Sequence, residues 1–88
     1  MGRVSFWTNY KYAIQNVYLN GELIGNIPSY FSTGTPYCGQ SGTLTVSRPA
    51  GVYNFSAESV GVFTTKTWKG TVTIIGDGCQ LQGLTVTK

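Results

Sequence analysis

The side chains that could carry out catalysis are few and widely separated in this sequence. Histidine is absent, and the three acidic residues, Glu22, Glu58 and Asp77, lie far from one another along the 88-residue chain. Acid–base or nucleophilic catalysis needs a titrating or attacking group held beside a partner that orients or activates it, and no such pair is evident. We therefore predict a protein without enzymatic activity and without a cofactor.

The two cysteines, Cys38 and Cys79, each stand next to a glycine in segments rich in turn-forming residues. Cysteines in loops are accessible to one another, so we expect a disulfide that closes a loop of about 40 residues and stabilises the fold by ~4 kcal/mol. The alternative is two buried, reduced thiols. Two cysteines without histidine lack the four ligands of a structural zinc site, so no zinc is expected.

Two short motifs have both a functional and a structural interpretation. Asp77 between two glycines could contribute to a calcium site, but a tight site needs several carboxylates, and we favour a turn residue. Asn54-Phe55-Ser56 matches the N-glycosylation sequon, yet it lies within an alternating segment. We therefore interpret this motif as part of a strand.

Aromatic residues are the remaining candidates for function. Four of them occupy alternating strand positions and are expected in the core: Phe6, Tyr53, Phe55 and Trp68. The others, Tyr18 included, are harder to bury together, and exposed rings beside amides and hydroxyls suit the apolar face of a sugar. The candidate ligand-binding residues are Trp7, Tyr10, Tyr12, Tyr30, Phe31 and Tyr37. Alternatively, the last three fold back over one end of the domain as a plug.

The elements that must position these residues are short segments of alternating polarity, which are typical of strands with one buried face. No segment shows helical spacing over ten residues. The expected strands are residues 3–8, 15–19, 22–27, two within 43–59, 68–75 and 80–87. This pattern predicts an all-β fold, a small antiparallel immunoglobulin-like β-sandwich of about seven strands, formed as one domain over residues 1–88. A closed barrel is the alternative.

The segments between the expected strands contain residues that predict particular turns and loops. Asn20-Gly21 favours a type I′ hairpin turn, and residues 48–51, which contain proline and glycine, predict a tight turn that makes residues 43–59 a central hairpin. Residues 59–67 are expected to be a connection or a short irregular strand, and Gly83 to mark a bulge. Residues 28–42 predict one long aromatic loop, a length that is uncommon unless the loop is functional or disordered.

The charge and composition of the chain limit its possible cellular locations and binding partners. The net charge of +3 is spread along the chain without a basic run, so nucleic acid is not an expected partner. No apolar run approaches the ~20 residues of a membrane span. A threonine-rich, charge-poor surface is common in secreted β modules, so we expect an extracellular, periplasmic or cell-surface location. The chain would then be an excised or mature piece of a larger protein, with Met1 as a cloning start.

Three segments resemble PEGA-type modules. Residues 17–25 (Val-Tyr-Leu-Asn-Gly-Glu-Leu-Ile-Gly) are similar to their V-Y-x-D/N-G hairpin, and residues 49–55 (Pro-Ala-Gly-Val-Tyr-Asn-Phe) to their P-x-G-x-Y turn and strand. Residues 71–74 resemble their final threonine-rich strand. The pattern is shared with carboxypeptidase-regulatory-like modules. The resemblance implies a non-catalytic appendage of a bacterial envelope protein, although the long aromatic loop and the cysteine pair depart from it and no site residues can be carried over.

Taken together, these observations predict a non-enzymatic structural or adhesive module of a bacterial envelope or secreted protein. The alternative is a carbohydrate-binding module that uses the loop aromatics. The expected partners are a polysaccharide or another envelope protein. A third hypothesis is a strand-donating or self-assembling domain, because the threonine-rich strands have little charge to protect their edges.

Overall fold

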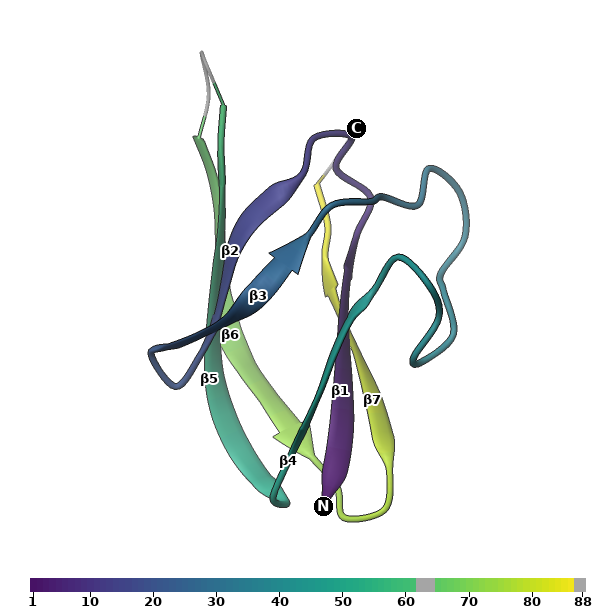
Figure 1. The fold of residues 1–88 in the computed structure, drawn as a ribbon, viewed down its shortest axis with the longest axis vertical. Helices are drawn as coiled ribbons and strands as arrows, with labels where there is room; N and C mark the ends of the chain where they lie inside the picture. Colours follow the sequence, from purple (N-terminus) through teal and green to yellow (C-terminus); the bar gives the residue numbers. More distant parts are fainter. Residues whose placement is uncertain (62–64, 87–88) are drawn as a thin grey trace.

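A computed structural model describes residues 1–61 and 65–86 of the chain, and every regular element in these residues is a β-strand. The seven strands form two sheets packed face to face (Figure 1), which confirms the predicted all-β sandwich. The strands are β1 Gly2–Thr8, β2 Ile14–Leu19, β3 Glu22–Ile27, β4 Leu44–Arg48, β5 Gly51–Val60, β6 Thr65–Ile74 and β7 Cys79–Leu84. The immunoglobulin-like topology stays a prediction.

The three-stranded sheet has the order β4-β1-β7, with the first strand of the chain in its centre. β1 pairs with β4 in antiparallel fashion, from Gly2 opposite Arg48 to Phe6 opposite Leu44. Its other neighbour, β7, runs parallel to it. The predicted antiparallel arrangement therefore holds for every strand pair of the described residues except this one, because the chain returns from the other sheet before it enters β7.

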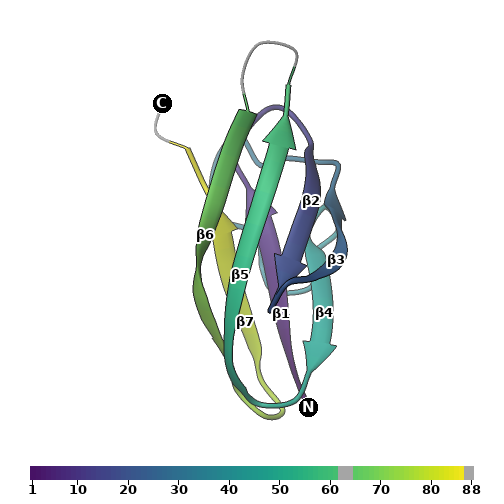
Figure 2. The ribbon, with the colours of Figure 1, turned by 90° about the vertical axis from the view of Figure 1, so that its left-hand side faces the viewer.

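The four-stranded sheet has the order β3-β2-β5-β6 and is antiparallel throughout (Figure 2). The predicted turn between β2 and β3 is confirmed, since Asn20 and Gly21 have φ values of 50° and 82°, as a type I′ turn requires. β5 and β6 pair over ten consecutive positions without a register shift. The sheet thus consists of two hairpins, β2–β3 and β5–β6, which are joined by the pairing of β2 with β5.

The central hairpin predicted over residues 43–59 is wrong. Its two strands exist, but β4 belongs to the three-stranded sheet and β5 to the four-stranded sheet. The turn at residues 48–51 therefore carries the chain from one layer to the other. The physical reason is that the apolar faces of both strands must reach the same core, which lies between the layers and not on one side of a single ribbon.

Two further expectations about β5, β6 and β7 need correction. The segment 59–67 is not an irregular connection, because β5 continues to Val60 and β6 begins at Thr65; residues 62–64 lie outside the described residues. Gly83 is not a bulge, since β1 and β7 stay in register from Cys79 to Leu84. Gly83 instead leaves room for Trp7, whose ring atoms would lie 3.2 Å from an added Cβ.

The core lies between the two sheets and is built from alternating inward-facing residues. Val4 and Phe6 of β1 are fully buried, and the Phe6 ring packs on Phe55 of β5 with 5.7 Å between ring centroids. The other buried apolar residues are Ile14, Val17, Leu19, Ile27, Ala57, Val72, Ile74 and Leu84. Within residues 1–61 and 65–86, no helical segment has the length and hydropathy that a membrane crossing requires.

Candidate functional site

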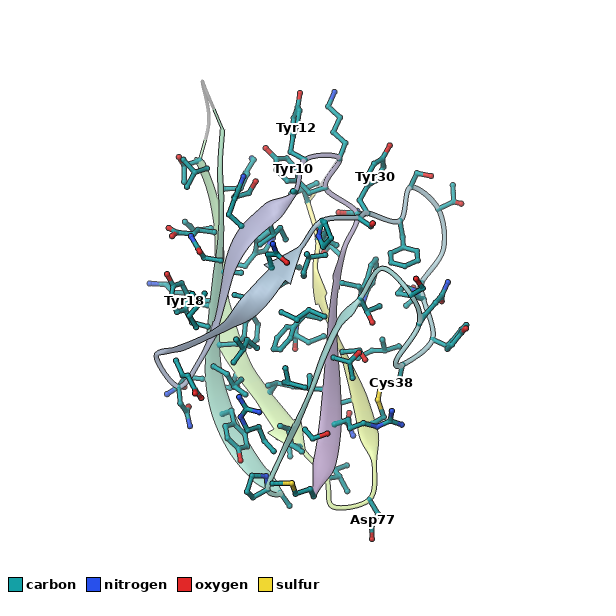
Figure 3. The ribbon with its side chains drawn as sticks, viewed as in Figure 1. Tyr10, Tyr12, Tyr18, Tyr30, Cys38 and Asp77 are labelled. Carbon is teal, nitrogen blue, oxygen red and sulfur yellow. A yellow bond between two sulfur atoms is a disulfide. The ribbon has the colours of Figure 1, made fainter. Side chains whose placement is uncertain are left out.

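The predicted disulfide between Cys38 and Cys79 is present. It joins the long loop between β3 and β4 to the first residue of β7, with 6.1 Å between the two Cα atoms. Buried Ser5 of β1 supports the joint, because its hydroxyl accepts a hydrogen bond from the Gly39 N–H at 2.8 Å and lies 2.6 Å from Thr45 Oγ1. A buried hydroxyl needs such partners. The disulfide and the Ser5 hydrogen bond therefore hold the loop against the outer face of the three-stranded sheet (Figure 3).

The loop of residues 28–43 is packed by its own side chains. The Phe31 N–H donates to the Thr8 carbonyl at 2.9 Å, and the Phe31 ring meets Trp7 edge-on with 6.3 Å between centroids. Gly42 allows this packing, because it has a φ of 96° and an added Cβ would lie 3.2 Å from Phe31 Cζ. Phe31 does fold back as a plug, but it covers the face of the three-stranded sheet and not an end of the sandwich.

The six candidate aromatic residues do not form one continuous ring surface. Trp7 and Phe31 are half-buried against each other. Tyr30 and Tyr37 of the loop are 49% and 70% exposed, so neither acts as a plug. Tyr10 and Tyr12 form a second ring pair between β1 and β2, with an interplanar angle of 68°. Figure 3 shows Tyr10, Tyr12 and Tyr30 at the same end of the sandwich.

Of the four aromatic residues expected in the core, Phe6 and Phe55 are buried, whereas Tyr53 and Trp68 pack against the core but are only half-buried. Trp68 also has a neighbour among the candidate aromatic residues. Its ring meets Tyr10 edge-on at 5.9 Å, and its Nε1–H donates to the Thr85 carbonyl at 3.0 Å. Tyr12, Tyr10 and Trp68 therefore form a row of three edge-on rings. Trp68 joins this row because β6 is an edge strand, which the sequence does not reveal.

The three acidic residues remain apart in the fold. Glu22 lies 3.5 Å from Arg48 in an exposed ion pair, and the Glu58 carboxylate accepts a hydrogen bond from the Asn16 side chain at 2.8 Å. Asp77 occupies the turn before β7 with a φ of 60°. The described residues contain no group of three or more potential metal ligands. Each acid thus has a local structural role, and Glu58 also lines a surface hollow together with Tyr18 and Trp68.

The motif at Asn54 lies within β5, as expected. The Asn54 N–H donates to Asn20 Oδ1 at 2.8 Å, which ties the β2–β3 turn to the neighbouring strand.

The edge strands of the two sheets bear on the hypothesis of a strand-donating or self-assembling domain. β3 is irregular, because its register with β2 shifts, whereas β6 is continuous and, within residues 1–61 and 65–86, pairs with β5 alone. That hypothesis stays a prediction.

Comparison with known proteins gave no match: no family model, no curated protein and no solved structure is significantly similar to the chain. The resemblance to PEGA-type modules therefore stays a prediction based on the residues that carry it.

Proposed function

We propose that this chain is a non-enzymatic structural module of a bacterial envelope or secreted protein, located outside the cytoplasm, and that it bears tension between its two ends. The parallel pairing of β1 and β7 is the observation that carries the proposal. Six consecutive residue pairs join the two strands, from Arg3 opposite Cys79 to Thr8 opposite Leu84. Because the strands are parallel, the chain enters β1 at one end of the sandwich and leaves β7 at the other (Figure 1).

This geometry determines how a pulling force acts on the domain. A force between the two ends slides β1 and β7 past each other, so the hydrogen bonds between them are loaded in shear and must fail together. In an antiparallel pair pulled at adjacent ends, the bonds instead break one after another. β1 is also held by β4 on its other side, from Gly2 to Phe6. The first strand is thus the central, doubly paired element of its sheet.

The disulfide adds a second mechanical property and supports an extracytoplasmic location. Residues between Cys38 and Cys79 stay closed in a covalent loop when the domain unfolds, which limits its extension. Structural disulfides persist in oxidising compartments such as the periplasm and the cell exterior. The resemblance of residues 17–25 and 49–55 to PEGA-type modules points to the same non-catalytic role.

Single-molecule force spectroscopy tests the proposal. The domain is pulled once through its two ends and once through Met1 and residue 49, where β1 and β4 start and end side by side. We expect a higher unfolding force for the end-to-end geometry, because it shears β1 against β7. Reduction of the disulfide frees 41 residue steps of about 3.3–3.6 Å each, and the bridged Cα atoms are already 6.1 Å apart. The unfolded chain therefore lengthens by roughly 130–140 Å, which identifies the unfolding event.

Equal forces in the two pulling geometries would refute the tension-bearing role.

The second candidate function, carbohydrate binding through the loop, is favoured by the exposure of Tyr30 and Tyr37 on a covalently tethered loop. Trp7 reports on this candidate, because its ring contacts Phe31 of the loop, whereas the ring of Trp68 contacts Tyr10.

A further inference from the structure

The side of the sandwich between β6 and β7 is not sealed by apolar side chains. Gln80, Gln82 and Leu84 share one face of β7, yet only Leu84 is fully buried, and the two glutamines are half-buried. Across from them, Gly70 of β6 leaves room for the Phe55 ring, which an added Cβ would meet at 3.1 Å. Polar residues on the inner face of a strand break the pattern that burial favours, and such breaks are expected at functional sites.

The opposite side of the sandwich, between β3 and β4, carries apolar side chains that pack against the core. Leu44 of β4 packs against the core there. Gly25 of β3 permits this packing, because an added Cβ would lie 3.0 Å from Leu44 Cδ1. The two sides of the same sandwich thus differ in chemistry, and only the β6–β7 side carries amide side chains toward the interior.

A cleft of about 380 Å³ opens between β6 and β7, which run along the same side of the molecule in Figure 2. Its floor is apolar and consists of Phe55 and Leu84, both buried. The rest of the lining comes from Thr67, Lys69, Gln82, Gly83 and Thr85. On β6, Thr67 and Lys69 alternate with the inward-facing Trp68, so their side chains lie toward the outer face of the sheet. Small-molecule sites have volumes of about 300–1,000 Å³ and combine apolar walls with a few placed polar groups.

Trp68 bridges the two sides of this cleft. Its Nε1–H bond to the Thr85 carbonyl, 3.0 Å long, crosses from β6 to the segment that follows β7 and holds the indole in place. An added peptide strand therefore cannot run along the whole cleft, and the occupant must be compact. Tyr10, packed edge-on against Trp68, and the exposed Tyr12 continue the aromatic surface beyond the cleft.

From this chemistry we propose that the β6–β7 cleft binds a pyranose unit of a saccharide. The apolar face of the sugar ring packs against Trp68, whose aromatic surface is held at a fixed angle. The sugar hydroxyls bond the Gln82 amide and the Thr85 hydroxyl. Lys69 is the one charged residue of the lining, and it can donate to a hydroxyl or to a uronic acid carboxylate. This site is independent of the tension-bearing role and of the exposed loop tyrosines.

Nuclear magnetic resonance on the ¹⁵N-labelled domain tests the site directly. Soluble neutral oligosaccharides of glucose, xylose, mannose and N-acetylglucosamine, and oligosaccharides of galacturonic acid, are titrated one at a time. We expect a saturable shift of the Trp68 indole N–H signal with at least one of them. The Trp7 indole signal is the internal comparison and should move less than that of Trp68, because Trp7 lies on the outer face of the other sheet and is separated from the cleft by Gly83.

Two matched substitutions on β7 complete the test. Gln82→Ala removes an amide that lines the cleft and should weaken binding about tenfold, the effect of losing one hydrogen bond to the ligand. Gln80→Ala removes the same group from the same face of the strand, outside the cleft, and should change the affinity less than twofold. The proposal is overturned if no oligosaccharide shifts Trp68, if Trp7 responds instead, if both variants bind equally, or if only strand-forming peptides bind.

Discussion

Loss of the Cys38–Cys79 disulfide should cost this domain a large part of its stability. The bridge spans a sequence separation of 41, for which the chain-entropy relation gives about 4 kcal/mol at 25 °C. Domains of this size have total free energies of unfolding of roughly 4–13 kcal/mol. With an unfolding entropy of about 2.1 cal/mol/K per residue, the same 4 kcal/mol lowers Tm by roughly 20 °C.

The structure explains why this cost should come from the unfolded chain. In the folded state the loop keeps other anchors, namely the Phe31–Trp7 ring contact and the Gly39 bond to Ser5. The native fold should therefore persist without the bridge, while the unfolded chain expands. A more expanded unfolded chain exposes more surface, so the urea m-value should rise when the bridge is absent.

Urea and thermal unfolding of three samples measure this effect: the oxidised protein, the protein with its thiols reduced, and the double variant Cys38→Ala/Cys79→Ala. The last two should agree within about 1 kcal/mol, and an exposed loop control, Ser41→Ala, should stay within ~0.5 kcal/mol of wild type. A loss below about 1 kcal/mol, or an unchanged m-value, would refute the entropic reasoning and show that the loop's other contacts hold the fold.

Two further substitutions test the packing around the loop and the end of β7. Gly83→Ala places a Cβ 3.2 Å from the Trp7 ring and should destabilise by about 1–3 kcal/mol, whereas Gly76→Ala, with nothing nearer than 4.0 Å, should be almost neutral in chemical denaturation. Thr8→Val removes the buried hydroxyl that donates to the Leu84 carbonyl at 2.6 Å and should lower the free energy of unfolding by about 1–3 kcal/mol. The same change at the exposed Thr73 should leave the stability unchanged. Equal effects at the two threonines would contradict the role of the buried hydroxyl.

The strands and the disulfide were predictable because their signals are local or compositional. An alternation with period two requires only one buried face, and Asn20-Gly21 specifies its turn from two adjacent residues. The cysteine pair needed no geometry, since the chain contains only two cysteines. The central hairpin failed because a strand–turn–strand pattern does not tell whether the second strand pairs with the first or crosses to another sheet.

The candidate site was only partly predictable. Aromatic content singled out Tyr10 and Tyr12, but their neighbour Trp68 looked like an ordinary core residue in the alternation of its strand. In β7, Gln80 and Gln82 stand in phase with the buried Leu84. The sequence does not reveal that these glutamines face the interior, because the inner and outer faces of β7 are known only once its partner β1 is known.

The sequence by itself determined the class of structure: seven short amphipathic strands, their turns, a long loop and a covalent staple. These features depend on neighbours within a few residues or on the mere number of cysteines. Only the tertiary structure decided which strands pair, and with that the parallel contact of β1 with β7, the crossing at residues 48–51 and the open β6–β7 side. Pairing brings together residues distant in the chain, and the energy that selects it arises from burying all apolar faces in one shared core.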